Sequence, residues 1–511
     1  MTELRSEPQP QRRLRSGSVG LSGAIAQSAA LIGPAAGAIV GSIFVAGLAG
    51  PAASLAFLIG TIVCVCIARV IGVHARHFPS AGSFYTYLTQ SFGPKAGFVG
   101  GLLLFGAYLL LLPFQLAFFG SFISSLFDSG PGIDVPWQIP AVLLVTLSVA
   151  LAVLGVHYSL KAGLIGLTAE VGILLIFAVV VLAQGGADGL TLQPFNPAAA
   201  PAGFFGGVML ACVFTIFAFV GFESATTLGE EVVEPRKTIP RAVMLTTVII
   251  GAFFLLISYT AVVGFGATPA GTEQLASDPA AFNTLALRYG GAWLSVLIDL
   301  ALVSSFVALN IVTVNAGARM LHALGRDHML PAALAKLNSR NVPGAAAYTI
   351  GGVGIVATLL FGSIWGPDNY ANWSAFFATF FFIAAYAMLC VGIFRYNGRN
   401  GRPEAEPGVL NRVVPIVALA GLALVLYGNV HPLPPAPLRY FIWVTAILIV
   451  IAIAIAYYLE RTQPDRLERA GQLLAGADDL PLVQEGAAAP APRSAGRIEV
   501  AGAEGDLERN P

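Results

Sequence analysis

The sequence predicts an all-α integral membrane protein. Of its 511 residues, 56% are hydrophobic and only 11% are charged, and the mean hydropathy is +0.78, whereas about 25% of an average soluble domain is charged. Many apolar runs exceed the roughly 20 residues with which a helix crosses a bilayer. They lack the alternation of apolar and polar residues that marks the strands of a membrane barrel. We therefore predict transmembrane helices and reject a barrel.

Twelve apolar runs predict twelve transmembrane helices within one domain, residues 20–460. Residues 1–19 are expected to form a cytoplasmic tail. Residues 461–511 are expected to be a disordered cytoplasmic tail, because their composition offers few large apolar side chains to bury. The approximate bounds of the twelve runs are 20–48, 52–75, 96–127, 136–155, 162–183, 204–229, 241–265, 290–314, 343–363, 371–394, 413–430 and 438–459.

The distribution of basic residues predicts the orientation. An even number of spans places both termini on one side, and 25 of the 27 lysines and arginines fall on that side, leaving Arg288 and Arg439 opposite. Because positive loops stay inside, both termini are expected in the cytoplasm, with the protein in the cell membrane. The net charge of zero says nothing about partners, because the charges are sorted by side; no nucleic-acid partner is expected. The excess of arginine over lysine indicates a GC-rich, bacterial gene. The four cysteines show no zinc-site spacing, and we expect neither a metal nor a cofactor.

Two of the runs are interrupted by residues that suit unwound backbone, at 33–37 and at 221–223. They lie five spans apart, so a five-helix unit repeated with opposite orientation would make them counterparts. Unwound backbone is tolerated in a membrane only beside a cavity, and the amino end of a resumed helix favours an anionic group such as a carboxylate. The alternative is a kink or close helix packing. The residues are Gly33, Pro34, Ala35, Ala36 and Gly37 in the first run and Gly221, Phe222 and Glu223 in the sixth.

Three segments carry a family resemblance, and together they cover most of residues 20–460 in order. They are GFESATTLGEEVVEPRKTIPRA (221–242), FPSAGSFYTYLTQSFGPKAGFVGG (78–101) and ARMLHALGRDHMLPAALAKLN (318–338). On these motifs the chain resembles the amino acid, polyamine and organocation (APC) transporter superfamily. One departure is that residues 35–37 read Ala-Ala-Gly where the family usually has Gly-x-Gly.

The resemblance implies a five-plus-five inverted repeat, the LeuT-like fold also seen in sodium-coupled neurotransmitter transporters, followed by two further helices. It also implies discontinuous first and sixth helices. Alternating access would then take place around a site between the first, third, sixth, eighth and tenth helices.

Three acidic residues lie within spans: Glu170, Glu223 and Asp299. An ionised acid at mid-bilayer costs about 2.5–3.5 kcal/mol, so each is expected to be paired, protonated or near water. Glu170 stands where some members of the superfamily have a lysine in the space of a sodium ion. A buried carboxyl can take up and release a proton near neutral pH, which predicts proton coupling. Binding of sodium or of a substrate amine, and a hydrogen bond to a neighbouring helix, are the alternatives.

The resemblance assigns expected roles to five further positions. Glu223 is expected to hold the broken sixth helix, with direct substrate contact as the alternative. Phe217 stands at the position of a gating tryptophan in one family member and is expected to cap the substrate. Tyr108 resembles a site-facing tyrosine. Ser304 and Ser305 match a region that supplies hydroxyls to a sodium site, although serines also serve helix packing.

The predicted function is secondary active transport of amino acids, by import or exchange, with a proton as the preferred coupling ion and sodium as the other candidate. A polyamine or organic amine is the alternative substrate, since three acids lie within the spans and the lysines and arginines stand only toward span ends or in loops. A channel is the alternative class. An enzyme is not expected, because the spans lack a nucleophile–base pair or an HExxH motif. Besides substrate and coupling ion, the only partner predicted is the lipid bilayer; the oligomeric state is not predicted.

Overall fold

The fold is described by a computed structural model of residues 17–80, 82–129, 132–278, 280–326, 329–399, 410–434 and 436–464. These residues are almost entirely helical, and the sole β-bridge among them joins Val19 to Val232. The two predicted tails lie almost wholly outside the described residues, so the disorder expected of 461–511 stays a prediction.

Sixteen α-helices occur in the described part of the chain. In order they are α1 (Leu21–Ile32), α2 (Pro34–Ala49), α3 (Ala53–His77), α4 (Phe84–Phe92), α5 (Pro94–Ser129), α6 (Gln138–Leu154), α7 (Val156–Ala183), α8 (Leu210–Phe219), α9 (Pro235–Phe265), α10 (Pro269–Ser277), α11 (Ala281–Tyr289), α12 (Ala292–Arg326), α13 (Gly344–Trp365), α14 (Pro367–Arg399), α15 (Leu410–Gly428) and α16 (Leu438–Thr462).

Ten segments of the described chain are long and apolar enough to cross a membrane. The first, Leu21–His77, contains two of the predicted spans, and α6, with 17 residues, falls among the shorter apolar helices. The chain is therefore a multi-pass membrane protein with about ten spanning helices. The division into twelve and the inverted repeat stay predictions.

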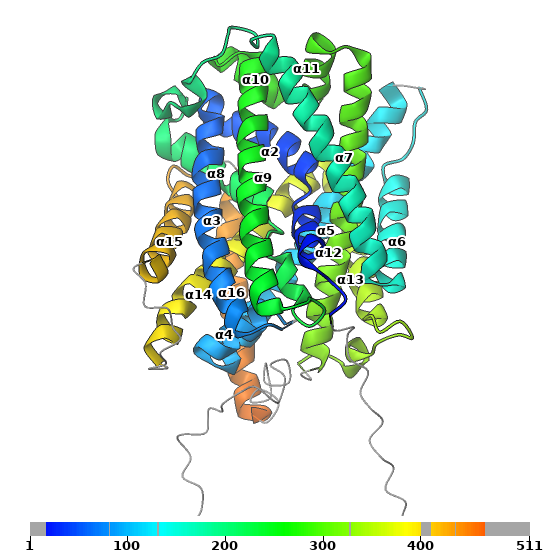
Figure 1. Cartoon of the computed structure of the whole chain (residues 1–511), viewed down its shortest axis with the longest axis vertical. Helices are drawn as coiled ribbons and strands as arrows, with labels where there is room; N and C mark the ends of the chain where they lie inside the picture. Colours follow the sequence, from blue (N-terminus) through cyan, green and yellow to red (C-terminus); the bar gives the residue numbers. More distant parts are fainter. Residues whose placement is uncertain are drawn as a thin grey trace, which may run out of the picture. The chain divides into compact units, whose positions relative to one another are not determined.

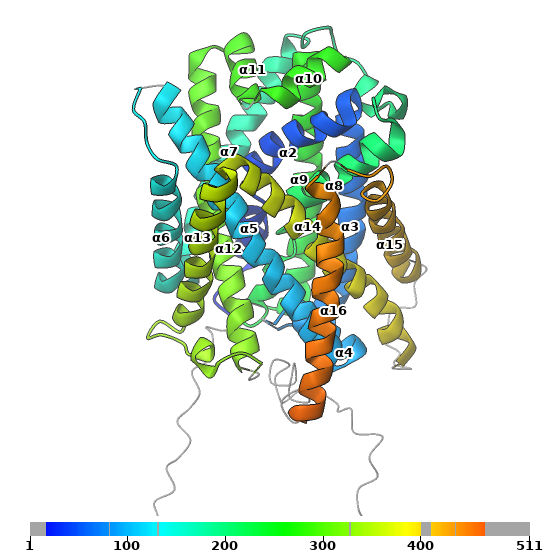
Figure 2. The ribbon, with the colours of Figure 1, turned by 180° about the vertical axis from the view of Figure 1, so that it is seen from behind.

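The longest helices cannot stand upright in a bilayer. Helix α5 has 36 residues. At about 1.5 Å per residue it reaches roughly 54 Å, well beyond a hydrocarbon core of about 30 Å. In Figure 2 it runs obliquely through the bundle. Tilt of this kind is the usual answer to excess length. As a result, α5 reaches both the interrupted helices and the end of the bundle where α4 lies.

Burial separates central from peripheral helices. The segment Phe204–Leu228, which contains α8, has 83% of its apolar window buried, against 17% for α16. Large apolar side chains on α16 remain exposed, including Trp443, Ile447 and Val450. In a membrane protein such a surface faces lipid tails. The segment that carries the second interruption is thus the most buried of the ten and lies at the centre of the bundle.

Three long pairings frame this centre: α3 with α9, α5 with α14, and α7 with α12 (Figures 1 and 2). The short helices α10 and α11 lie at one end of the bundle, and α4 lies at the other (Figure 1). The interrupted helices pack against members of these pairs: α1 against α7, α9 and α12, and α8 against α3, α9 and α14.

The backbone at Gly221 gives a first testable prediction. Its φ is +115°, and a Cβ there would lie 2.6 Å from the carbonyl carbon of Leu31. We expect Gly221→Ala to cost at least about 1–3 kcal/mol, because both the backbone conformation and the close approach to α1 oppose a side chain. The measurement is the thermal unfolding midpoint of the purified protein.

Gly352→Ala in α13 is the matched control, since no atom lies within 4 Å of the place where its Cβ would stand. Its unfolding midpoint should equal or slightly exceed that of the wild type, because alanine is favoured over glycine in a helix interior. Equal midpoints for both variants would contradict the proposed close packing of Gly221 against α1.

Candidate functional site

The first interruption is confined to one residue. Helix α1 ends at Ile32, Gly33 adopts a left-handed conformation with φ 61° and ψ 74°, and α2 begins at Pro34. Glycine takes this conformation at little cost, and proline suits the first position of a helix because its missing N–H is not needed there. The Gly37 N–H already donates to the Gly33 carbonyl at 2.7 Å. The interruption predicted over 33–37 is thus narrower than expected.

The amino end of α2 is capped by side chains from two other helices. The Ala35 N–H donates to Glu170 Oε2 of α7 at 3.3 Å, and the Ala36 N–H donates to Ser305 Oγ of α12 at 3.1 Å. Pro34 has no N–H to offer. The backbone donors that the sequence assigns to a substrate carboxylate are therefore occupied by Glu170 and Ser305.

Glu170 is completely buried, yet one of its oxygens lacks a partner. Oε2 accepts from Ala35, while Oε1 has no hydrogen-bond partner. An unpartnered polar atom in an apolar interior is costly, and such atoms cluster at functional positions. Ser304 does not join this arrangement. Its Oγ faces Gly166 on α7, 2.7 Å from where a Cβ would stand. Of the two predicted serines, only Ser305 reaches the end of α2.

The second interruption follows α8, which ends at Phe219; the chain resumes as a 3₁₀-helix at Ser224–Leu228. Between them, Glu223 accepts three hydrogen bonds: from Gly221 N at 3.0 Å, Tyr386 Oη at 2.9 Å and Tyr108 Oη at 3.1 Å. Both of its oxygens are used, and its side chain is fully buried. Glu223 therefore fixes the interrupted backbone to α5 and α14, and the Tyr108 hydroxyl is committed to Glu223.

Two serines join the interruptions to each other. Ser28 Oγ donates to the Phe222 carbonyl at 2.8 Å and accepts from the Ala225 N–H at 3.1 Å. Ser224 Oγ donates to the Gln27 carbonyl at 3.1 Å. Sequence reasoning missed Ser28, Ser224 and Tyr386. The serines carried a weak signal, because each stands close to an interruption, whereas nothing near Tyr386 in the sequence marks it.

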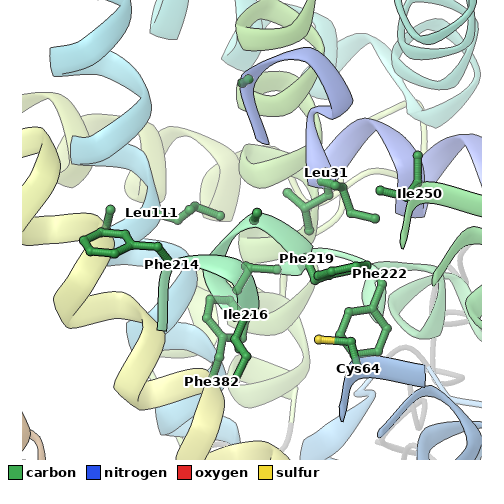
Figure 3. Packing of buried hydrophobic residues seen from close by; sticks show 14 of the residues in the cluster. Leu31, Cys64, Leu111, Phe214, Ile216, Phe219, Phe222, Ile250 and Phe382 are labelled. Atoms are coloured by element: carbon green, nitrogen blue, oxygen red, sulfur yellow. The ribbon is translucent and has the colours of Figure 1, made fainter. Parts of the chain in front are cut away.

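A cavity lies where the interrupted helices meet, and every residue that lines it is apolar. Figure 3 shows part of the surrounding cluster, with Leu31 on α1, Leu111 on α5 and Phe214 on α8. The full lining consists of Leu31, Ile32, Ala36, Gly37, Val40, Gly41, Phe44, Leu111, Phe114, Phe214, Phe217, Ala218, Val220 and Leu309.

The predicted site residues divide between this cavity and its support. Ala36, Gly37 and Phe217 line the cavity. The others lie around it and are not part of the lining: Gly33, Pro34, Ala35, Tyr108, Glu170, Gly221, Phe222, Glu223, Ser304 and Ser305. Helices α1, α2, α5, α8 and α12 supply the lining residues, whereas α14 contributes through the bond of Tyr386 to Glu223.

Aromatic rings border the cavity on the α2 side. The ring centroids of Phe44 and Phe214 are 5.0 Å apart, and those of Phe114 and Phe217 are also 5.0 Å apart in an edge-to-face arrangement. Such pairs are held by dispersion and by weak ring electrostatics, at about 0.5–1.5 kcal/mol beyond area burial. This aromatic border contains no charged group, so the rings can move apart without breaking an ion pair.

A polar arrangement lies away from the cavity, 12 residues before the lining residue Leu31 and 10 residues after the lining residue Leu309. We name it the polar lock; it consists of Val19, Glu231, Val232, Val233 and Arg319. The Val233 N–H donates to the Val19 carbonyl at 2.8 Å, and Arg319 Nε lies 2.8 Å from Glu231 Oε1, with both side chains only 4% exposed. Removal of one partner of a buried ion pair strongly destabilises the folded protein, because the other charge is left buried and unpaired. The lock joins the segment before α1 to the loop after the second interruption and to α12.

Comparisons with known proteins agree with this architecture. The model of the family described as amino acid permease matches residues 24–459. The branched-chain amino acid permease BcaP of Bacillus subtilis is 26% identical over 362 residues, 66% of this chain and 74% of that protein. The permease of the same name from Lactococcus lactis is 26% identical over 411 residues, 75% of this chain and 83% of that protein.

A probable GABA permease of Pseudomonas aeruginosa is 25% identical over 444 residues, covering 84% of this chain and 90% of that protein. Among solved structures, MhsT in complex with L-phenylalanine superposes with a TM-score of 0.58 at 15% sequence identity, covering 81% of this chain and 99% of that chain. At this identity the likeness shows the fold alone.

The Glu223 cluster gives a second prediction. We expect Tyr108→Phe and Tyr386→Phe each to lower the unfolding free energy by about 1.5–3 kcal/mol, because each removes a buried hydrogen bond to a carboxylate. In a Glu223→Ala background, either tyrosine change should cost much less, since its acceptor is already gone. Thermal unfolding of the single and double variants gives the coupling energy.

Tyr348→Phe is the control, because the Tyr348 side chain on α13 is 62% exposed. Fully additive losses in the double variants would mean that the tyrosine hydroxyls do not act through Glu223.

Proposed function

The chain belongs to the amino acid permease family, and we propose that it is a secondary active transporter of neutral amino acids with large apolar side chains. The observation that carries this proposal is the cavity lined only by apolar residues at the meeting point of two interrupted helices. Its volume of about 20 Å³ admits one water-sized molecule, so the cavity has to widen to take an amino acid. An interrupted helix supplies backbone polar groups for the amino and carboxyl groups of a substrate. The apolar lining then suits its side chain.

The apolar lining disfavours a cationic amino acid or a polyamine as substrate. A charged group moved into such a cavity without a counter-charge loses its hydration. The acids that the sequence offered as counter-charges are engaged elsewhere. Glu223 accepts three bonds, Glu170 caps α2, and Asp299 accepts from Asn283 at 2.9 Å. The two relatives named branched-chain amino acid permeases support the same substrate class.

We infer alternating access from the unequal closures of the cavity. The aromatic border can open by rotation of side chains, whereas the polar lock must separate a buried ion pair and a backbone bridge. The sorting of basic residues places the lock, with both termini, on the cytoplasmic side. The cavity would then open outward through the aromatic border and inward by release of the lock.

Proton coupling through Glu170 completes the proposal. Its unpartnered oxygen, and its bond to Ala35 next to the cavity-lining Ala36, support this role. Sodium is the weaker candidate. A sodium ion needs several oxygen ligands. Apart from Glu170, Ser305 is the one side chain that caps α2 in the described chain, so unwound backbone carbonyls, which sodium sites in this type of fold also use, would have to supply the other oxygens.

Uptake into liposomes containing the purified protein tests this function. Under an imposed proton gradient, we expect accumulation of radiolabelled leucine, isoleucine, valine or phenylalanine, and counterflow of the same substrates without a gradient. Arginine, lysine and putrescine should neither accumulate nor compete, because the cavity offers no counter-charge.

Accumulation of arginine or putrescine would refute the substrate class and leave transport itself intact. Ion conductance that is independent of substrate would instead support a channel. Counterflow is the decisive control, because a channel cannot exchange one amino acid against another.

The polar lock gives a further prediction. In Glu231→Gln/Arg319→Gln both charges are removed together, so no buried charge is left unpaired. We expect this variant to open more often toward the side of the lock. A cysteine introduced by Ala24→Cys on the buried face of α1 should then react faster with a maleimide, about tenfold for each 1.4 kcal/mol of lost lock energy.

The parent protein with its four native cysteines provides the background labelling. Glu230→Gln/Arg326→Gln is the matched control, since that neighbouring pair, 3.1 Å apart, is more exposed, at 24% and 28%. Equal labelling rates in the two double variants would argue against a special role of the Glu231–Arg319 pair.

A further inference from the structure

We propose that Glu170 is an internal substitute for the carboxylate of the substrate. In the empty transporter it occupies the amino end of α2, and protonation makes it give up that position to the substrate. Coupling of proton and amino acid is then an exchange of one carboxylate for another on the same backbone N–H. This inference rests on the function proposed above and specifies how proton and substrate are linked.

The backbone N–H groups in the first turn of α2 already have partners. The first turn of a helix offers unpaired N–H groups. At α2, Pro34 has none, and the Gly37 N–H is bonded to the Gly33 carbonyl. The remaining donors are those of Ala35 and Ala36, which are held by Glu170 and Ser305. A substrate carboxylate that uses this helix end must therefore displace one of these side chains.

The position of the cavity supports the exchange. Ala36 and Gly37 line the cavity, whereas Glu170 and Ser305 approach the same helix end without lining it. The two carboxylates would thus reach one helix end from different sides. A helix amino end carries about half a positive charge, which stabilises one anion, and a second anion close by is repelled. Simultaneous binding of both ionised carboxylates is therefore unfavourable.

Protonation of Glu170 removes the repulsion between the two carboxylates. Ionised Glu170 takes up one proton, its bond from Ala35 weakens, and the substrate carboxylate accepts from the freed N–H. The Ser305 hydroxyl, whose oxygen accepts from the neighbouring Ala36 N–H, is then the acceptor that we propose for the new carboxylic O–H. No covalent bond to the substrate forms or breaks. One proton accompanies each zwitterionic amino acid, so one positive charge moves per transport step.

No titratable side chain on the helices packed against α7 makes a described contact with Glu170 that would share this proton. The helices packed against α7 are α1, α2, α6, α9, α11 and α12. The first three contain no titratable side chain. The titratable residues of the other three are Arg236, Lys237, Arg241 and Tyr259 on α9, Arg288 and Tyr289 on α11, and Asp299, Arg319, His322 and Arg326 on α12. None of these makes a described hydrogen bond or ion pair with Glu170.

The test measures proton uptake upon binding of L-leucine to the detergent-purified protein in weak buffer. We expect one proton to be taken up per leucine bound while Glu170 is ionised. The apparent Kd should then fall about tenfold for each unit by which the pH is lowered, because proton and substrate binding are reciprocally linked. With Glu170→Gln, leucine should bind without proton uptake and independently of pH, and counterflow should persist without accumulation in a proton gradient.

Two controls separate this exchange from other causes. Asp299→Asn, the same chemical change in a different membrane acid, should keep proton uptake and the pH dependence. Leucinol, which has the amine and side chain of leucine but no carboxylate, should bind to the wild type without proton uptake. This comparison needs no variant, so it holds even if Glu170→Gln fails to fold.

The outcomes distinguish the two proposals. If wild-type protein neither binds nor exchanges leucine, the proposed function is wrong. If leucine is exchanged but binds without proton uptake, or if leucinol causes the same uptake as leucine, the carboxylate exchange is wrong and the transport function stands. Unchanged pH dependence in a folded Glu170→Gln protein would overturn it as well.

Discussion

The structure depends on satisfying the backbone of two interrupted helices inside an apolar bundle. Each interruption exposes N–H and C=O groups that neither lipid nor apolar side chains can bond. The chain supplies partners from its own side chains. Ser28 of α1 bonds the backbone of the second interruption, Ser224 bonds the Gln27 carbonyl within α1, and Glu223 holds the Gly221 N–H. The long helices α5 and α14 enter this network through tyrosine hydroxyls, so the centre and its frame are one hydrogen-bonded unit.

Two buried acids therefore have different tasks, although both lie within apolar helices. Glu223 uses both oxygens and accepts three donors, so it has the partners that a permanent anion needs. Glu170 accepts a single backbone bond through one oxygen and leaves the other unpartnered. A fully bonded carboxylate resists change, whereas a partly bonded one is poised to exchange partners. This difference supports the fixed structural role proposed for Glu223 and the changing role proposed for Glu170.

The two sides of the cavity also differ in kind. On one side, phenylalanine rings such as Phe114 and Phe217 meet through dispersion contacts. On the other, the Glu231–Arg319 pair and the bridge at Val19 close the molecule through directional polar bonds. Rings can slide with small changes in energy, but a buried ion pair tends to be either formed or separated. A carrier that opens to one side at a time needs one closure that can open while the other stays closed.

The sequence alone determined the helical membrane class, because long apolar runs leave few alternatives in a bilayer. It also located both interruptions and Glu170, since glycine, proline and acids stand out in apolar runs. The tertiary structure decided what these residues bond. It gave Glu223 its partner Tyr386, 163 positions away, and brought Glu170 of α7 to the amino end of α2. Hydrogen bonds act over about 3 Å in space regardless of separation along the chain, and a single sequence records only that separation.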